Sequence, residues 1–329
     1  MGIEILYGPE YQTKIWDWIK ENGSEIAFAY LNRPHIATKY VDFIKDHTNI
    51  KIIYYGHDLH FLREYREYEL TGDLKKKRES DYWRSIELSM MEKAAVSYYP
   101  SQVEVDAIHQ IDQTIPVKAI TAYVYDHFLD KIQKNFALRE GLLFVGGFAH
   151  PPNADGVLWF AREIFPLIHQ ALPQVNFYVV GSKVTEEIKN LEKEVPGIVV
   201  KGFVSEEELA SLYAQCRMVV VPLRYGAGVK GKVVEAIYNG APIVTTSVGA
   251  EGIPQVEQVL AIADEPETFA EKVIQLYEDT ETLSRMCGKT QEYIREHFSL
   301  DGAWNVIKED FAWTPSQREE EAAGKTREE

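Results

Sequence analysis

The sequence predicts an α/β protein made of two Rossmann-like domains, each a parallel sheet with helices on both faces. Short apolar runs, such as residues 50–55 and 218–221, are typical of buried parallel strands. These runs alternate with stretches of helical periodicity, and a βαβα alternation favours parallel strands joined by helices. The 329 residues, of which 45% are hydrophobic, are enough for two medium-sized domains with separate cores.

The first half contains five expected strands, at residues 3–6, 25–30, 50–55, 96–99 and 117–121. Helical spacing indicates helices at 11–21, 38–46, 62–70, 82–95 and 103–110. Open α/β sheets bind ligands at the carboxyl ends of their strands. We therefore note the polar residues that follow the strand at 50–55, namely His57, Asp58 and His60.

The second half repeats the alternation. Strands are expected at 142–145, 176–180, 198–200, 218–221 and 242–246. Helices are expected at 154–171 with a distortion at Pro166, and at 206–215, 230–238, 266–279, 281–297 and 303–313. Ser205 and Glu208 form a capping box for the helix at 206–215. The polar, charged composition from residue 314 onward predicts disorder.

A glycine-rich loop between the strand at 218–221 and the helix at 230–238 carries the strongest functional signal. Its three glycines lie within six residues, at positions 226, 228 and 231. Such a loop before a helix N-terminus favours anion binding, because free N–H groups and the helix dipole face the ligand. Lys230 and Lys232 add positive charge, and the Glu235 carboxylate could accept hydrogen bonds from sugar hydroxyls. The pattern therefore predicts a site for a phosphate and a diol.

Two common nucleotide motifs are missing from this loop. The Walker pattern fails because Val233 follows Lys232, and G-x-G-x-x-G is absent, which counts against kinases and dehydrogenases. The alternative interpretation of this loop assigns it no function. In that case it is a plain βαβ connection with two solvated lysines and a surface glutamate.

The net charge of −16 argues against a nucleic-acid partner and against adhesion to anionic lipid. The two cysteines, Cys216 and Cys287, form no metal or redox motif and are expected to be buried thiols in a reducing compartment. The sequence shows no apolar run of the ~18 residues that a membrane span needs, and no signal peptide. We therefore expect a cytoplasmic protein.

Several motifs of the second half, in their order along the chain, resemble the nucleotide-sugar-binding domain of retaining glycosyltransferases of family 4, also called group 1, which have the GT-B fold. The matching pieces are residues 142–147 (LLFVGG) with Asn153, 179–181 (VVG), 201–204 (KGFV), 221–223 (VPL) and 226–236 (GAGVKGKVVEA) with Gly240. They lie in this order between residues 142 and 240 and mark a domain of about 170 residues, at 130–302. The resemblance implies two Rossmann-like domains that face a cleft.

The resemblance also implies the reaction. A sugar would pass from a nucleotide diphosphate sugar to a hydroxyl of a glycan, lipid-linked or protein acceptor, with retention of configuration, as in polysaccharide biosynthesis by hexosyltransferases. Lys230, Lys232 and the N–H groups of Gly228 and Val229 would stabilise the leaving diphosphate. The other donor-binding residues implied by the family match are Gly147 opposite the diphosphate, Glu235 on the ribose, and Phe203 with Val204. No D-x-D occurs, so we expect neither a metal nor another cofactor.

In the first half, Tyr55-Gly-His57-Asp58 resembles the strand-end histidine segment of the family. His57 is the candidate acid/base, Asp58 would orient it, and Lys230 would assist the reaction from the other side. His60 is a rival for the same role. A histidine in a turn can instead be a satisfied polar group without a catalytic role.

Two departures from the family pattern keep alternatives open. Ala227 stands where many members have a glutamate, and the first half is short and lacks an expected glycine-rich loop. The chain could therefore be a donor-binding module or partner subunit of a larger synthase, with further domains elsewhere, and a nucleotide-sugar epimerase is a second alternative. The expected organisation is an abbreviated first domain at 1–129, a nucleotide-sugar domain at 130–302, a crossover helix at 303–314 and a tail at 315–329.

Overall fold

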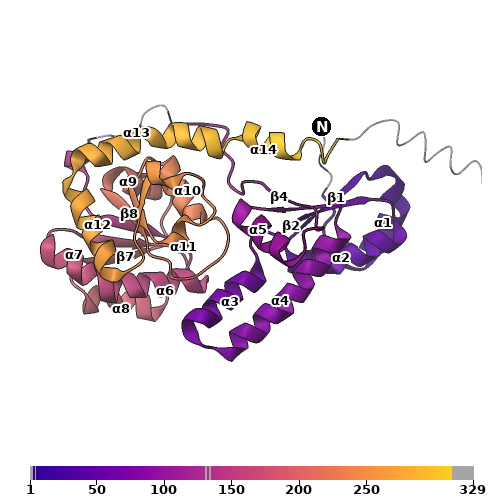
Figure 1. The fold of residues 1–329 in the computed structure, drawn as a ribbon, viewed down its shortest axis with the longest axis horizontal. Coiled ribbons are helices and arrows are strands. Elements are labelled where there is room, and N and C mark those ends of the chain that lie inside the picture. Colours follow the sequence, from indigo (N-terminus) through magenta and orange to yellow (C-terminus); the bar gives the residue numbers. More distant parts are fainter. Residues whose placement is uncertain (1–2, 4, 130–131, 133–134, 313–329) are drawn as a thin grey trace, which may run out of the picture.

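The protein is described here by a computed structural model that covers residues 3, 5–129, 132 and 135–312. Two lobes lie side by side, the first built from the N-terminal part of the chain and the second from the rest (Figure 1). Helices α13 (Thr280–His297) and α14 (Leu300–Ile307) run along one side of the molecule and lead from the second lobe to the first. The predicted tail at 315–329 lies outside the described residues.

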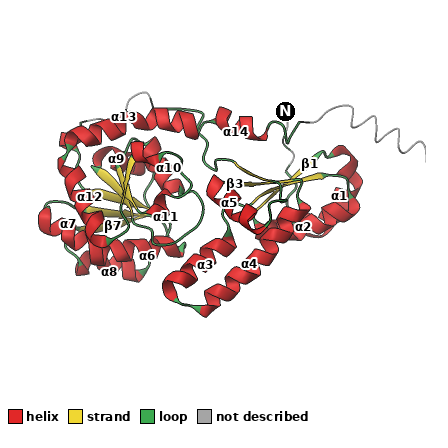
Figure 2. Ribbon diagram, in the orientation of Figure 1, coloured by secondary structure: helices red, strands yellow, loops and turns green. Residues whose placement is uncertain are grey.

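The sheet of the first domain has four parallel strands in the order β1 (Phe28–Asn32), β2 (Lys51–Tyr55), β3 (Val96–Tyr99) and β4 (Val117–Ala119). Its helices are α1 (Pro9–Asn22), α2 (Pro34–His47), α3 (His60–Thr71), α4 (Leu74–Lys93) and α5 (Gln102–Ile111), and Figure 2 shows α3 and α4 projecting as a hairpin.

The strand predicted at residues 3–6 is wrong at Ile3, Ile5 and Leu6, the described residues of that stretch. Ile3 and Ile5 are exposed, and β1, not this stretch, forms the edge of the sheet.

The second sheet has six parallel strands in the order β10, β9, β8, β5, β6, β7. Their bounds are β5 (Leu142–Val145), β6 (Phe177–Val180), β7 (Ile198–Gly202), β8 (Met218–Val221), β9 (Ile243–Thr245) and β10 (Leu260–Ile262). The chain runs outward from β5 to β7 and then returns to start β8 beside β5. The strand order therefore reverses between β5 and β8, which is where open α/β sheets bind ligands.

The remaining helices cover this sheet. They are α6 (Pro151–Trp159), α7 (Phe165–Ala171), α8 (Glu186–Glu194), α9 (Glu206–Gln215), α10 (Gly231–Tyr238), α11 (Ser247–Ala250) and α12 (Pro266–Glu278). The distortion expected at Pro166 is one π-helical turn, Phe160–Ile164, which separates α6 from α7. Helices α8 and α11 and strand β10 are absent from the prediction. The predicted capping box is confirmed in part, since Ser205 Oγ accepts from the Glu208 N–H at 3.2 Å.

The C-terminal segment after α13 packs on the first sheet. Val306, Ile307 and Phe311 contact the apolar cluster around Ile53 and Tyr98. Asp310 accepts hydrogen bonds from Lys118 Nζ, at 2.7 Å, and from the Tyr98 hydroxyl. Trp304, in contrast, is exposed on the outer face of α14.

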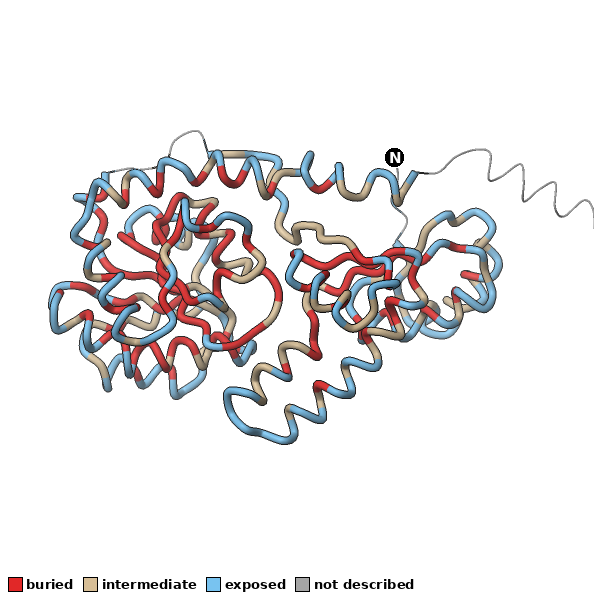
Figure 3. The backbone as a smooth tube through the Cα atoms, viewed as in Figure 1, coloured by how far each residue is buried: buried red, intermediate tan, exposed pale blue. Residues whose placement is uncertain are grey.

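Buried residues concentrate in the two sheets and in the helix faces against them, whereas the outer ends of α3 and α4 are exposed (Figure 3). Each domain has its own apolar core, so the sequence-based expectation of two cores is confirmed. Among the described residues, no helix is both long and apolar enough to cross a membrane.

Candidate donor and acceptor site

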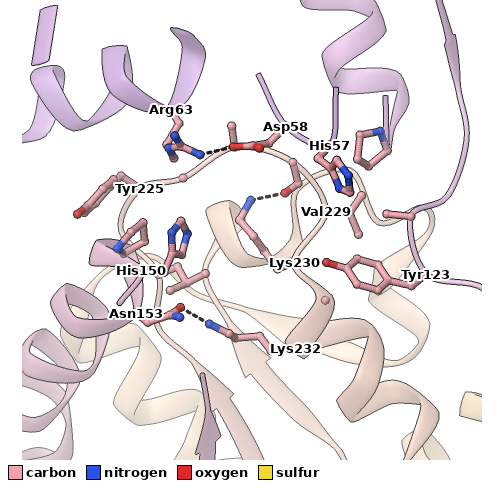
Figure 4. Close-up of a pocket in the computed structure, with 18 of the residues that line it drawn as sticks. His57, Asp58, Arg63, Tyr123, His150, Asn153, Tyr225, Val229, Lys230 and Lys232 are labelled. Carbon is pink, nitrogen blue, oxygen red and sulfur yellow. Dashed lines mark hydrogen bonds and ion pairs between the residues drawn. The ribbon is translucent and has the colours of Figure 1, made fainter. Parts of the chain in front are cut away.

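A cavity of about 380 Å³ lies between the two domains (Figure 4). The first domain contributes a wall of polar side chains: Arg33, His57, Asp58 and Arg63, next to Pro100. The second domain contributes the turn after β5, with His150, Pro152 and Asn153, and the loop after β8, with Leu223 and residues 225–232. Ala122 and Tyr123, from the passage between the domains, complete the lining. The cavity thus lies at the switch point between β5 and β8.

The glycine-rich loop packs directly against the first domain. Gly228 has φ of 75°, a backbone conformation that favours glycine. A Cβ there would lie 3.2 Å from Asp58 Cβ and 3.1 Å from Glu104 Oε1, so a side chain would press against the opposite domain. Glycine at this position therefore allows both the turn and the close approach of the two domains.

Lys230 is held at the end of this loop by carbonyl and carboxylate oxygens. It is the N-cap residue of α10, and its Nζ donates to the Gly228 carbonyl and lies 3.5 Å from Glu251 Oε2. Burial lowers its pKa, while the charge of Glu251 acts in the opposite direction. Arg66 of α3 donates to Glu251 from the other side, at 2.6 and 2.8 Å. Lys230 is thus a buried cation that a carboxylate shared with the first domain already partly balances.

Lys232 lies one position into α10 and points toward the turn after β5. Its Nζ donates to Asn153 Oδ1 (Figure 4). The same Nζ lies 4.9 Å from the centre of the Phe144 ring. Burial lowers its pKa to about 7, with the charge of Lys230 as a second cause. A diphosphate between the two ammonium groups would oppose the lowering of both lysine pKa values, because its negative charge favours the charged form of each amine.

His57 occupies the turn that follows β2 and lines the cavity from the first domain. Its φ is 70°, which is uncommon for a residue other than glycine. The ring Nε2 contacts Asn32 Oδ1, and the ring packs at 4.6 Å against Tyr55. Burial lowers the pKa of His57, and the charge of Arg33 adds to the shift. A neutral imidazole at neutral pH is suited to accept a proton.

The rival histidine, His60, does not line the cavity. It is buried at the start of α3, where its Nδ1 lies 3.1 Å from Glu87 Oε1. Asp58 does line the cavity, but its carboxylate pairs with Arg63 and not with His57. His57 therefore lines the cavity, and the residue that contacts and orients its ring is Asn32, not Asp58.

The predicted catalytic and donor-binding residues divide into two groups. His57, Asp58, Gly228, Val229, Lys230 and Lys232 all line the cavity. Gly147, Phe203, Val204 and Glu235 are not part of its lining. Phe203 is 81% exposed, and Gly147 accepts a hydrogen bond from Asn153 Nδ2 at 2.7 Å through its carbonyl. Glu235 is half-buried one turn after Lys232, and burial raises its pKa.

Among the lining side chains that were not singled out from the sequence are Arg33, Tyr123, His150 and Tyr225. Arg33 and His150 follow β1 and β5, so the rule that ligands bind at strand ends could have found them. Burial lowers the pKa of His150, and the nearby charge of Arg63 adds to this shift. The sequence carries no comparable local signal for Tyr123 or Tyr225.

Comparison with known proteins decides the relationship that the motifs suggest. Residues 139–279 match the family model described as glycosyl transferases group 1. Residues 139–279 thus form a domain similar to those of the group 1 glycosyl transferases. This domain contains the β5 turn, the loop after β8 and both lysines, and the predicted family resemblance is therefore confirmed.

Solved structures extend the likeness to the first domain. The Staphylococcus aureus protein TarM superimposes with a TM-score of 0.71 over 89% of this chain and 57% of its own, at 15% identity. Sucrose-phosphate synthase from Thermosynechococcus elongatus does so with a TM-score of 0.71 over 97% of this chain and 81% of its own, also at 15% identity. The two facing parallel-sheet domains are therefore those of the predicted GT-B fold.

A curated relative gives a third comparison. An uncharacterized 44.6 kDa protein in the cps region of Klebsiella pneumoniae is 26% identical over 172 residues. The match covers 50% of this chain and 44% of that protein. The chain thus spans only about half the length of the TarM and Klebsiella relatives.

Proposed function

We propose that this chain is a glycosyltransferase that moves a sugar from a nucleotide diphosphate sugar to an acceptor hydroxyl in the cavity between its domains. The observation that carries the proposal is the position of Lys230 and Lys232. Both ammonium groups are buried at the start of α10, at the switch point of the second sheet, and both line the cavity. A chain with a net charge of −16 has little other reason to hold two cations there without a carboxylate for each.

The reaction follows from what these groups can stabilise. As the bond between the sugar and the diphosphate breaks, negative charge grows on the leaving diphosphate and positive charge on the sugar ring. Cations fixed beside the diphosphate lower this barrier, since they need not reorganise as the charge develops. His57, on the opposite wall, would take part in transfer of the proton of the acceptor hydroxyl. Otherwise, its turn would only form part of the surface on which the acceptor lies. Retention of configuration is a part of the proposal that rests on the family resemblance, and independence of metal ions is a part that rests on the lack of a D-x-D motif in the sequence.

We take a UDP-sugar as the first donor to test. A mutant of the Staphylococcus aureus TarM was solved with UDP and α-GlcNAc-glycerol, and its TM-score to this chain is 0.67 at 15% identity. Glu235 would then receive the ribose hydroxyls, and Phe203 with Val204 would lie near the base. The acceptor is proposed to be a glycan, lipid-linked or protein hydroxyl. The same proposal has three further parts. They are a location in the cytoplasm, a role in polysaccharide biosynthesis, and a further partner subunit.

One observation favours a second candidate, a donor-binding module without transfer activity. Ala227 lines the cavity where many relatives of this type would have a glutamate, so one carboxylate expected beside the donor sugar is missing. Incubation with radiolabelled UDP-sugars, with and without lipid and glycan extracts, separates the two candidates. Label in an acceptor product that the Lys230→Ala variant does not form supports the transferase. Donor binding without product, and without hydrolysis of the donor, supports the module.

A further inference from the structure

Arg33 is the one cation of the described cavity lining whose side chain is not already engaged. The other three have partners: Arg63 pairs with Asp58, Lys230 with Glu251, and Lys232 donates to Asn153. Among the residues that the structure describes, no hydrogen bond or ion pair is made by the Arg33 guanidinium. Its backbone, in contrast, is well fixed, since its N–H donates to the Tyr55 carbonyl at 3.0 Å. An anchored backbone thus presents an unpaired charge to the cavity.

The backbone at Arg33 is also strained. Its φ of 64° and ψ of 140° form a combination that residues other than glycine rarely adopt. Pro34 follows at the first position of α2 and restricts Arg33 to extended ψ values. The neighbouring strand ends in the same way, because His57 has φ of 70° and also lines the cavity. Asn32, the residue before Arg33, contacts the His57 ring.

Such strain concentrates at functional sites, where the surrounding structure keeps a side chain in a required position. Glycine at position 33 would relieve the strain, but it would also remove the guanidinium from the cavity. Two strained turns side by side, one with an unpaired cation and one with the candidate acid/base, indicate that this wall is built to receive a ligand.

The charge of the cavity limits what that ligand is. Its lining has four Lys and Arg side chains, Arg33, Arg63, Lys230 and Lys232, but a single carboxylate, Asp58. The two lysines belong to the second domain, where the diphosphate of the donor would lie. Arg33 lies on the opposite wall, in the first domain. Because the chain as a whole carries −16, an anionic ligand reaches this wall only if a local positive charge offsets the repulsion.

We propose that Arg33 binds an anionic group, a carboxylate or a phosphate, on the acceptor, so that the acceptor of this chain is an acidic or phosphorylated sugar. The planar guanidinium suits both groups, since it can donate two parallel hydrogen bonds to either. The inference rests on the proposed function, because only a transferase has an acceptor on this wall. It specifies the acceptor class, which the proposed function leaves open.

The test compares acidic and neutral sugars on the full chain. Methyl glucuronide and glucose 6-phosphate serve as acidic probes and methyl glucoside as the neutral one, each titrated by ligand-observed NMR with saturating UDP to occupy the donor side. The variants are Arg33→Gln, Arg33→Lys and Arg33→Gly. Arg84→Gln is the matched control, because Arg84 is an exposed arginine of α4 outside the cavity lining.

The wild type and Arg84→Gln are expected to bind both acidic probes in preference to methyl glucoside. Arg33→Gln should weaken the acidic probes by about tenfold or more and leave the neutral probe and UDP unchanged. Arg33→Lys should keep part of the binding, and raised salt should weaken binding of the acidic probes in the wild type, Arg84→Gln and Arg33→Lys but hardly change it in Arg33→Gln. Arg33→Gly should lose the acidic probes while its melting temperature rises, because strain at this φ is relieved. The rise would show that the loss does not come from unfolding.

Three results would overturn the inference. In the first, the wild type binds UDP but does not prefer acidic probes. In the second, Arg33→Gln binds acidic probes like the wild type. In the third, Arg33→Gln loses UDP affinity instead, which would assign Arg33 to the donor. A wild type that binds no nucleoside diphosphate contradicts the proposed function itself, and the inference then falls with it.

Discussion

Arg66 and Glu251 form a bidentate ion pair that joins the two domains, with Nη1···Oε2 at 2.8 Å and Nη2···Oε1 at 2.6 Å. The same arginine donates to the Gly226 carbonyl at 2.7 Å. The same carboxylate approaches Lys230 at 3.5 Å. One pair of residues, 185 positions apart, thus connects α3 of the first domain to the glycine-rich loop and its lysine.

We expect this pair to couple the domains measurably. Both side chains are largely shielded from water, with 28% and 13% exposed, and the contact is bidentate. A double-mutant cycle with Arg66→Gln and Glu251→Gln should give a coupling of about 1 kcal/mol in the free energy of unfolding. The exposed pair Arg162–Glu187, with 47% and 56% of its side chains exposed, is the control and should give about 0–0.5 kcal/mol. Equal couplings in the two cycles would show that Arg66 and Glu251 do not hold the domains.

Lys232 should make both stability and UDP binding depend on pH. Burial lowers the pKa of its amine in the folded state to about 7 from its ordinary value of 10.5. Between these two pH values the unfolded chain holds a proton that the folded chain has released. The free energy of unfolding therefore increases as the pH rises over this window. Below about pH 7 both states are protonated and this gain is absent. Lys232→Met should remove this pH dependence, whereas Lys189→Met, at an exposed lysine of α8, should keep it.

The same shift predicts proton uptake when the donor binds. At pH 8 the Lys232 amine is largely neutral in the empty site, and a diphosphate beside it favours the ammonium form. Calorimetry of UDP in buffers with different ionisation enthalpies should therefore report uptake approaching about one proton in the wild type and clearly less in Lys232→Met. Equal uptake in the two proteins would place the titrating group elsewhere.

Glu235 should distinguish ribose from deoxyribose although it does not line the described cavity. If it accepts hydrogen bonds from the ribose, the wild type should prefer UDP over 2′-deoxy-UDP or 3′-deoxy-UDP by about tenfold or more. Glu235→Gln should fold normally and bind the three ligands almost alike. A variant that still discriminates as the wild type does would exclude Glu235 as the ribose acceptor.

His57 should affect turnover and not donor binding. If it serves proton transfer, His57→Ala should lower transfer on the order of 10²–10⁴-fold while UDP affinity stays close to that of the wild type. His57→Asn is the informative second variant, because asparagine tolerates positive φ and can preserve the turn without the imidazole. A His57→Asn variant with wild-type turnover would show that the residue only shapes the turn.

The sequence was most informative where the signal is local. Lys230 and Lys232 follow a strand and a run of glycines, and their order along the chain was enough to place them at a helix N-terminus beside the cavity. The strands at 142–145 and 218–221 were predicted with their observed bounds because they are apolar throughout and, except for Val145, buried. The strand expected at 3–6 failed for the opposite reason: apolar residues without a neighbouring strand stay exposed.

What the sequence could not predict are contacts between distant segments and unusual backbone angles. Nothing near Arg66 indicates that Glu251 is its partner. Nor does the pattern around Arg33 or His57 reveal that both adopt positive φ. Phe203 shows a further limit, since a family motif marked it as donor-binding, whereas the structure leaves it 81% exposed outside the cavity lining. Its role stays a prediction until a donor is bound.

The most direct test of the account is a calorimetric titration of nucleoside diphosphates and their nucleosides into the wild type and Lys230→Ala. UDP comes first, followed by GDP, ADP and TDP, and circular dichroism confirms that the variant is folded. We predict that one diphosphate binds the wild type well above its nucleoside. We also predict that Lys230→Ala weakens the diphosphate by roughly 1.5–3 kcal/mol and leaves the nucleoside unchanged. Equal losses for nucleoside and diphosphate, or no diphosphate binding to the wild type, would contradict the assignment of this cavity to a nucleotide diphosphate sugar.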